Sequence, residues 1–443
     1  MSAFDPAVFS RNSRFEIDHL SIASIPVSEL IAEFGSPLFV VDEADFRSRA
    51  AQWKSALEAA FGERAGSVYY AAKSFISKEV ARWVEQVGIG LDVCTGGELA
   101  VAQASGFPAS RIELHGNNKS EDEIRQAITY GVHTIVVDSF FEIERVARLA
   151  SEPGVIQRVY IRVTPGVEAH THEFISTAHE DVKFGFSLAS GAAWDAISAI
   201  RAEDSLKLVG LHSHIGSQIF KSEGFGAAAA KLISLLARYK DTYGVELPEL
   251  DLGGGYGIAY LPGEVTLDPS RILNELAAIV KSECAAAQIA VPIISIEPGR
   301  AIVGPTTTTL YTVGTTKDVE LDGGETRRYI AVDGGMSDNV RPALYGAEYM
   351  AIVANRLPLG PNRASRVVGK HCESGDIIIR DIELSADVQP GDILAVPATG
   401  AYGYSMASTY NHVPRPAVVA VSEGAARLIV RRESIADLLA LEI

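Results

Sequence analysis

Short runs of apolar, often β-branched residues recur along the chain between Val68 and Gly299, and stretches with helical spacing separate them. Residues 77–86 and 227–240 are two of these helical stretches. Alternating strand and helix signals predict a parallel sheet. The apolar runs are VYYAAKS (68–74), GLDVCT (90–95), IELHGN (112–117), TIVVDS (134–139), RVYIRV (158–163), LVGLHSHIG (208–216), PELDLGGGYG (248–257) and IISIEPG (293–299).

These runs make eight strand–helix units in roughly 230 residues, the number that a (β/α)8 TIM-type barrel requires. We assign residues 41–304 to the barrel. An open doubly wound sheet is the alternative, although it normally has fewer strands. Capping boxes directly after three of the strands predict where helices begin: Thr95 to Glu98, Ser120 to Glu123 and Ser139 to Glu142.

The pattern changes after about Gly304 to short strands separated by Gly, Pro and Asp. Helical spacing is nearly absent until residues 433–443. This pattern predicts an all-β barrel or sandwich over residues 305–443. Residues 1–40 do not fit the barrel, and we expect this N-terminal segment to complete the β domain. The predicted fold class is therefore α/β plus all-β.

The chain has 39 Lys and Arg against 56 Asp and Glu, a formal net charge of −17. This charge argues against nucleic acid or an anionic membrane surface as a partner. The sequence contains neither an apolar stretch long enough to span a membrane nor a signal-peptide pattern. Three cysteines, Cys94, Cys284 and Cys372, do not make a disulfide framework, so we expect a cytoplasmic protein.

Chemistry in such barrels sits at the carboxyl ends of the strands. Lys73 ends the first run, where a desolvated amine can form a Schiff base; the plainer interpretation is a lysine whose stem packs and whose ammonium reaches solvent. The predicted strand ends hold Lys73, Asp92, His115, Asp138, Arg162, His214, the glycines of 253–257, and Glu297.

Two loops at these ends have the composition of a phosphate site. Gly253–Gly257 follows the seventh strand and Glu297–Arg300 the eighth, the two loops that often hold phosphate in barrels. The glycines are equally compatible with a tight turn that requires positive φ.

Histidines offer several interpretations. His212 and His214 lie on one face of a strand and could stack on a planar ligand, bind metal, or be core histidines with satisfied hydrogen bonds. Three more histidines, His170, His172 and His179, fall in a polar segment that we predict to be a mobile loop rather than a metal cluster.

A lysine, two phosphate loops, a ring-stacking imidazole and a carboxylate in one barrel mouth together indicate pyridoxal 5′-phosphate. Its aldehyde requires an amine, its phosphate requires backbone amides, and its pyridine nitrogen requires an acidic partner, for which Glu297 is the candidate. No metal is expected.

The β domain adds two candidates. Cys372 precedes a carboxylate in a Gly/Ser loop and is either a small packed thiol or an exposed proton donor. Arg341, beside Pro342, either binds a carboxylate with both arms of its guanidinium or forms a surface ion pair.

With these motifs, the sequence closely resembles the diaminopimelate decarboxylases, which are alanine-racemase-like, fold-type III pyridoxal-phosphate enzymes. The resemblance extends over nearly the whole chain. It is carried by YYAAKS, LDVCTGGEL, HGNNKS, GLHSHIGSQ, LDLGGGYGI, EPGR, DNVRPALYGA, CESGD and GAYGYSMASTYN. One departure is Glu348-Tyr349 in place of a more usual aromatic pair, which we expect to affect packing near Tyr345.

The resemblance implies a role for each matching residue. Lys73 would bind the cofactor covalently, His214 would stack on its ring, and Cys372 would return a proton to the substrate. The cofactor-binding set would be Lys73, His214, Ser217, Gly254, Gly255, Glu297, Pro298, Gly299, Arg300 and Tyr402. The substrate-binding set would be Arg300, Arg341, Tyr345, Glu373 and Tyr402.

The implied reaction is decarboxylation of meso-2,6-diaminopimelate at its D centre to L-lysine, the last step of lysine biosynthesis. In this family Cys372 and Glu373 would serve the pocket of the other subunit, so the active unit would be a homodimer with shared sites. Three alternatives remain: an ornithine- or arginine-type decarboxylase, a non-catalytic cofactor-binding paralogue, and a metal-dependent hydrolase built on His212 and His214.

Overall fold

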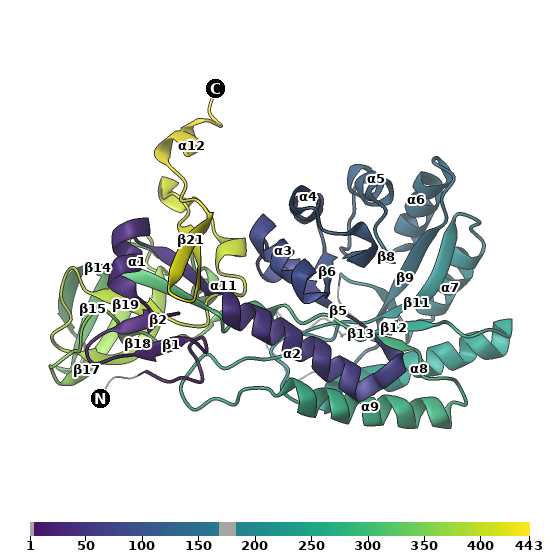
Figure 1. Cartoon of the computed structure of the whole chain (residues 1–443), viewed down its shortest axis with the longest axis horizontal. Coiled ribbons are helices and arrows are strands. Elements are labelled where there is room, and N and C mark those ends of the chain that lie inside the picture. Colours follow the sequence, from purple (N-terminus) through teal and green to yellow (C-terminus); the bar gives the residue numbers. More distant parts are fainter. Residues whose placement is uncertain (1–3, 168–182) are drawn as a thin grey trace. The chain divides into compact units, whose positions relative to one another are not determined.

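The computed structural model describes residues 4–167 and 183–443, which form two compact units. The first, here called the barrel unit, consists of Arg49–Gly257 and Leu267–Gly299. The second, here called the β unit, consists of Met1–Ser48, Ile258–Thr266 and Arg300–Ile443. Each unit therefore combines segments that are far apart in sequence, as the mixture of colours in Figure 1 shows.

Eight parallel strands close into the barrel, because the last strand pairs with the first. Each strand pairs with the next along the chain, and a ninth short strand, β10 (Phe186–Ser187), adds to β9. The eight strands are β5 (Ala65–Ala71), β6 (Gly90–Val93), β7 (Ile112–Leu114), β8 (Thr134–Val137), β9 (Gln157–Thr164), β11 (Leu206–His212), β12 (Glu249–Asp251) and β13 (Ile293–Ile296). This arrangement confirms the predicted TIM-type barrel.

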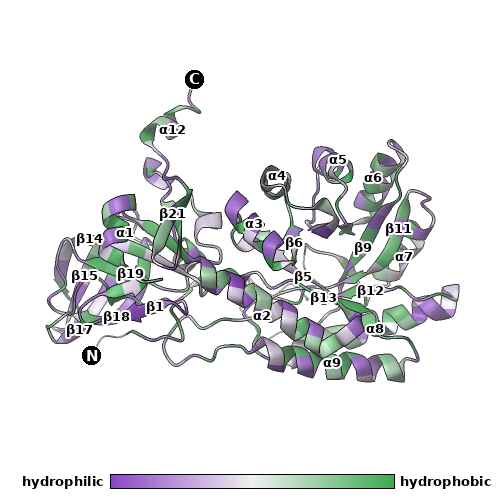
Figure 2. Cartoon of the chain, viewed as in Figure 1, coloured by the Kyte–Doolittle hydropathy of each residue, from purple (hydrophilic) through white to green (hydrophobic). Residues whose placement is uncertain are grey.

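Helices follow the strands, and successive helices pack against one another. Hydrophilic and hydrophobic residues alternate along α2, α8 and α9 in Figure 2, as expected when one helix face is buried and the other is solvated. The helices with residues in this unit are α2 (Glu43–Phe61), α3 (Lys78–Val87), α4 (Gly96–Ser105), α5 (Glu121–Tyr130), α6 (Phe140–Ser151), α7 (Ala192–Arg201), α8 (Ser222–Tyr243) and α9 (Pro269–Ala286).

The three predicted capping residues do cap helices, but only Ser120 forms a reciprocal capping box. At the other two helices the capping hydroxyl accepts the expected backbone N–H. The glutamate side chain, however, accepts the N–H of the residue before the capping residue. Glu98 accepts the N–H of Cys94, and Glu142 accepts that of Asp138. These bonds fix the loops between strand ends and helices, where candidate site residues lie.

The β unit is built on a seven-strand path in the order β18-β17-β15-β14-β4-β20-β21, with β16 and β19 branching from it. The strands are β4 (Leu38–Asp42), β14 (Thr307–Glu320), β15 (Thr326–Val332), β16 (Ile352–Val353), β17 (Asn362–Val368), β18 (Ile377–Ser385), β19 (Ile393–Val396), β20 (Ala417–Ser422) and β21 (Ala425–Val430). Short helices α1 (Val27–Phe34), α10 (Arg300–Val303), α11 (Arg341–Tyr345) and α12 (Ile435–Leu439) complete it.

The N-terminal segment completes this unit. Strand β4 lies between β14, to which it is antiparallel, and β20, to which it is parallel. Before it, β1 (Ser13–Phe15), β2 (Leu20–Ile22) and β3 (Ile25–Pro26) form a small antiparallel sheet. The predicted fold class is confirmed. Among the described helices, none has the length and apolar character that a bilayer-spanning helix needs.

Candidate active site

Lys73 lies in the short 3-10 turn η2 (Ala72–Ser74), directly after β5. Its Nζ lies 3.1 Å from Oδ2 of Asp92 on the neighbouring strand. The Lys73 side chain is 37% exposed, so its amine is accessible to a ligand. Burial raises the pKa of Asp92 to about 7, against the opposing effect of the Lys73 ammonium. The barrel therefore presents an accessible amine beside an acid that titrates near neutral pH.

The buried carboxylate of Glu297 follows β13 and faces two imidazoles. Its Oε1 lies 3.0 Å from His212 Nε2 and 3.3 Å from His115 Nε2. Burial lowers the pKa of both histidines. Burial alone would raise the pKa of Glu297, but the two imidazoles hold it well below its usual range. Among the described residues Oε1 makes no hydrogen bond of good geometry, so this ionised carboxylate can accept one from a ligand.

Two further carboxyl groups, Glu113 and Asp251, are fully buried, and oxygens of these residues and Glu297 lie within 4.8 Å of one another. Burial, together with the neighbouring acids, raises the pKa of Glu113 and of Asp251 well above the ordinary range. Asp251 Oδ1 also accepts the N–H of Gly253 at 2.6 Å. The cluster therefore places two carboxyl groups with a raised pKa beside Glu297, whose pKa is lowered, and Asp251 connects the cluster to the glycine turn.

The glycine turn after β12 packs directly against neighbouring backbone. A Cβ at Gly254 would lie 2.2 Å from the carbonyl oxygen of Glu297, and one at Gly255 would lie 2.1 Å from that of Gly216. Gly255 also has φ +107°, which L-residues rarely adopt. No side chain fits at either position. The turn therefore consists of glycines packed closely against neighbouring backbone, a composition compatible with the predicted phosphate loop.

The remaining predicted cofactor residues of the barrel unit are placed around these loops. The half-buried His214 accepts the N–H of Gly254 through Nδ1 at 3.3 Å, and burial lowers its pKa well below the usual range. Ser217 follows in the same loop and is half-buried, whereas Pro298 is buried. A Cβ at Gly299 would lie 2.8 Å from Cβ of Ala71, so the loop after β13 also packs tightly.

The β unit contains a buried group of two arginines and two tyrosines, Arg300, Arg341, Tyr260 and Tyr349. Both guanidiniums donate hydrogen bonds to the hydroxyl oxygen of Tyr260, and Arg341 also donates to Tyr349. Among the described residues, no carboxylate lies within ion-pair distance of Arg341, which is 7% exposed. A surface ion pair for Arg341 is therefore wrong, and its guanidinium is available to bind an anion.

Tyr349 belongs to the sequence departure that we expected to affect packing near Tyr345. Its hydroxyl accepts a hydrogen bond from Arg341, so it also belongs to the arginine group. Tyr345 ends α11 and is half-buried. The ring of Tyr402 lies 4.9 Å from the guanidinium carbon of Arg300.

The loop that carries Cys372 and Glu373 lies on the surface of the β unit, with both residues exposed. The N–H of Cys372 donates to Asn411 Oδ1 at 3.3 Å, and Glu373 Oε1 accepts the N–H of Gly375 at 3.1 Å. The backbone of the loop is therefore held, while the thiol remains accessible.

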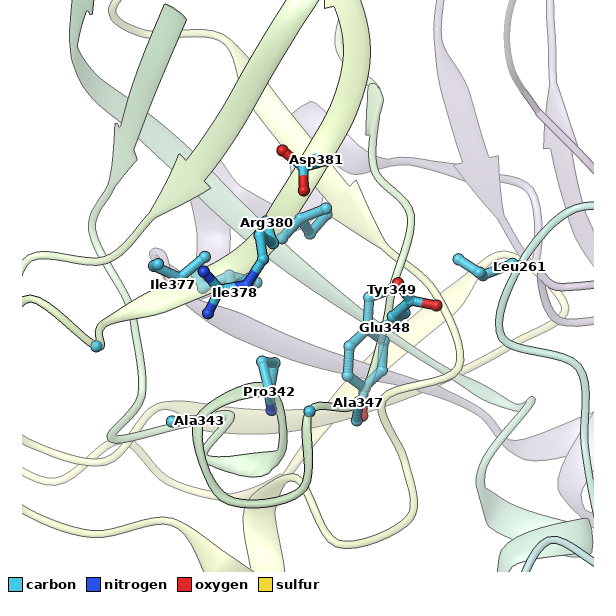
Figure 3. A pocket seen from close by; sticks show the side chains of 13 residues that line it. Leu261, Pro342, Ala343, Ala347, Glu348, Tyr349, Ile377, Ile378, Arg380 and Asp381 are labelled. Atoms are coloured by element: carbon cyan, nitrogen blue, oxygen red, sulfur yellow. The ribbon is translucent and has the colours of Figure 1, made fainter. Parts of the chain in front are cut away.

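A cavity of about 170 Å³ lies beside α11 (Figure 3). Pro342 and Ala343 form one side, Glu348 and Tyr349 another, and Ile377 and Ile378 of β18 a third. None of the residues predicted for the site lines it, although Tyr349 of the arginine group does.

His212 and His214 do not face one shared ligand position, whereas His115, His212 and Glu297 each present a possible ligand atom within 4.8 Å of one another. His212 faces Glu297, whereas His214 bonds to the glycine turn. His170, His172 and His179, which we predicted to lie in a mobile loop, are outside the described residues.

Asp338 begins the turn that leads to Arg341 and is a buried acid. It accepts the N–H of Gly335 at 2.9 Å and a hydrogen bond from the hydroxyl of Tyr311. Burial raises the pKa of Asp338 to about 7, although both hydrogen bonds oppose the shift.

This shift predicts that Asp338 makes the protein less stable as pH rises. Because the native carboxyl titrates near 7 and the unfolded one near 3.9, the native state retains a proton that the unfolded state loses. Relative to Asp338→Asn, the wild-type free energy of unfolding should fall by up to about 4 kcal/mol between pH 4 and pH 8. Urea unfolding of both proteins across this range measures the difference, and parallel curves would contradict the assignment.

Comparison with known proteins agrees with this geometry. Residues 43–304 match the family model described as "Pyridoxal-dependent decarboxylase, pyridoxal binding domain". The chain is 54% identical to a diaminopimelate decarboxylase of Mycobacterium tuberculosis, with 99% of this chain and 98% of that protein covered. It is 46% identical to one of Bacillus subtilis, covering 96% and 95%.

A solved structure is similar over the same extent. The diaminopimelate decarboxylase of M. jannaschii, in complex with L-lysine, superimposes with a TM-score of 0.90 at 30% identity and covers 98% of both chains. With a lysine, a carboxylate cluster and a glycine turn in the barrel, this chain belongs to the diaminopimelate decarboxylase family of pyridoxal-phosphate-dependent enzymes.

Proposed function

We propose that this protein decarboxylates meso-2,6-diaminopimelate to L-lysine and CO₂, the last step of lysine biosynthesis. The observation that carries the proposal is the buried pair Arg300 and Arg341, whose guanidiniums suit a substrate that keeps a carboxylate away from the reacting carbon. A substrate that ends in an amine alone would be matched by an acid instead. L-Lysine, bound in the M. jannaschii structure, is the product that this reaction would give.

The barrel residues fit the cofactor's chemical groups. When bound, pyridoxal phosphate supplies a protonated ring that accepts the electron pair left when the bond from Cα to the carboxylate breaks. Lys73 Nζ would be the amine for its aldehyde, and the glycine turn after β12 would hold its phosphate. Glu297, whose pKa is lowered, would accept a hydrogen bond from the protonated ring nitrogen and keep the proton there.

Three other side chains complete the reaction. Asp92 keeps the Lys73 amine in place, and its raised pKa allows it to accept and return a proton near neutral pH. His214 presents a neutral ring for stacking, held by Gly254. Cys372 donates the Sγ proton to Cα after CO₂ has left, and solvent restores that proton.

The β unit is assigned to the far end of the substrate. Arg300 and Arg341 bind its carboxylate, Glu373 binds its amine, and Tyr345 and Tyr402 line the site. Pro298, Gly299 and Ser217 are proposed as the remaining cofactor contacts.

The substrate assay that tests the proposal compares CO₂ release from meso-diaminopimelate, L-ornithine, L-arginine and L-lysine by the cofactor-loaded protein. We expect kcat/KM for meso-diaminopimelate to exceed the others by at least about a hundredfold, since the alternatives leave the buried arginines without a second carboxylate. A preference for ornithine or arginine would contradict the assignment, and binding of cofactor without turnover would indicate a non-catalytic paralogue.

We further propose that the active unit is a cytoplasmic homodimer in which Cys372 and Glu373 serve the partner's site. Their exposed positions on the β unit support this arrangement. The three cysteines are all free thiols, which suits a reducing compartment.

A further inference from the structure

Tyr260 holds a central position in the arginine group that no predicted role explains. It lies in the segment Ile258–Thr266, which belongs to the β unit although the chain on either side belongs to the barrel unit. Hydrogen bonds within the segment hold its backbone, since Glu264 Oε2 accepts the N–H groups of Tyr260 and Leu261 at 2.7 and 3.1 Å. The phenol is 7% exposed, so its hydroxyl is presented inside the unit by a fixed backbone.

One oxygen atom joins the two guanidiniums. Nη1 of Arg300 and Nη1 of Arg341 both donate to the Tyr260 hydroxyl, the latter at 3.0 Å. Two nitrogens bonded to one acceptor lie no more than about 6 Å apart. Like charges at this separation repel, and the shared acceptor oxygen opposes this repulsion and contributes to holding the two arginines together before an anion arrives.

The rings reinforce this geometry. The guanidinium carbon of Arg341 lies 5.1 Å from the centroid of the Tyr260 ring, and the Tyr349 ring packs edge-on to Tyr260 at 5.4 Å. Burial would raise the pKa of Tyr260, but the two arginines outweigh it and lower that pKa through their charge and their hydrogen bonds to the phenolic oxygen. Each arginine uses one nitrogen on this oxygen, and a guanidinium has further N–H groups for a carboxylate.

We propose that Tyr260 is a positioning residue that sets the spacing of Arg300 and Arg341 for the carboxylate at the substrate's far end. It thereby determines the preference for ligands that carry this carboxylate. This inference rests on the proposed function and extends it to a residue that would act through the two arginines.

The test compares two ligands of the cofactor-loaded protein that differ only in the carboxylate: L-lysine and 1,5-diaminopentane. In Tyr260→Phe, calorimetric titration should show L-lysine binding weakened about tenfold or more, because the charge-assisted hydrogen bonds that align both arginines are lost. Affinity for 1,5-diaminopentane should change less than about twofold. KM for meso-diaminopimelate should rise with the loss in lysine affinity, while kcat falls much less.

Matched variants separate positioning from general damage. Tyr311→Phe removes another buried hydroxyl of the β unit, one bonded to Asp338, and should leave the lysine-to-diamine preference unchanged. Tyr349→Phe, which removes one bond to Arg341, should have a smaller effect than Tyr260→Phe. Tyr260→His retains a ring nitrogen that can accept a hydrogen bond from an arginine, so it should recover part of the lysine-to-diamine preference. This variant also provides the test if Tyr260→Phe does not fold.

The outcomes distinguish the two proposals. If the wild-type protein neither binds L-lysine nor releases CO₂ from meso-diaminopimelate, the proposed function fails. If the wild-type protein does both and Tyr260→Phe keeps the same lysine-to-diamine preference, the positioning role of Tyr260 is overturned while the function stands. An equal loss for both ligands in a folded variant would also overturn it.

Discussion

Replacing Lys73 with alanine should remove the visible absorbance of the bound cofactor and lower turnover of meso-diaminopimelate by at least about a thousandfold. The amine is exposed enough to react, and Asp92 holds it at the end of β5, where chemistry occurs in this type of barrel. Absorbance spectra of the loaded wild-type and variant proteins, followed by single-turnover assays, measure the two effects.

Lys78→Ala is the matched control, because Lys78 is exposed at the start of α3, only five residues further along the chain. It should keep both absorbance and turnover. Hydride reduction of the loaded wild-type protein, followed by peptide mass analysis, should place the cofactor adduct on Lys73. An adduct on another lysine would refute the site described above.

The barrel could be predicted because its signal is local. Each buried strand is a short apolar run, and hydroxyl residues mark the helix starts that follow, as at Ser120. The place of β4 between β14 and β20 depends on pairings between distant parts of the chain. Only the misfit of residues 1–40 with the barrel pattern indicated it. No comparable pattern in the sequence indicated that Ile258–Thr266 belongs to the β unit.

For the active site, too, the sequence predicted some residues and not others. Position at a strand end identified Lys73 and Glu297 as candidates, but their partners depend on packing. Asp251 could have been found, because an acid between Leu250 and Leu252 in an apolar strand is a buried ionisable group that needs a partner. Tyr260 had no such signal, since its bonds join segments that only the folded chain brings together.

The second large effect concerns Cys372. Alanine at this position should lower turnover by at least about a hundredfold, because the exposed thiol is the proposed proton donor to Cα. Cofactor absorbance should remain, unlike that of Lys73→Ala, since the barrel residues are unchanged. Steady-state kinetics and spectra of the same preparation separate these outcomes.

Mixing the two inactive variants tests whether a dimer shares its sites. After random subunit exchange, half of the dimers are hybrids, and each hybrid has one site with both Lys73 and Cys372, so about a quarter of wild-type activity should return. A second mixture, of equal amounts of the wild-type chain and a chain with both substitutions, tests the same arrangement by loss of activity. Shared sites leave every hybrid inactive and about a quarter of full activity, whereas separate sites leave about half. Activity near half, with exchange shown by mass, would place Cys372 and Lys73 of one chain in the same site.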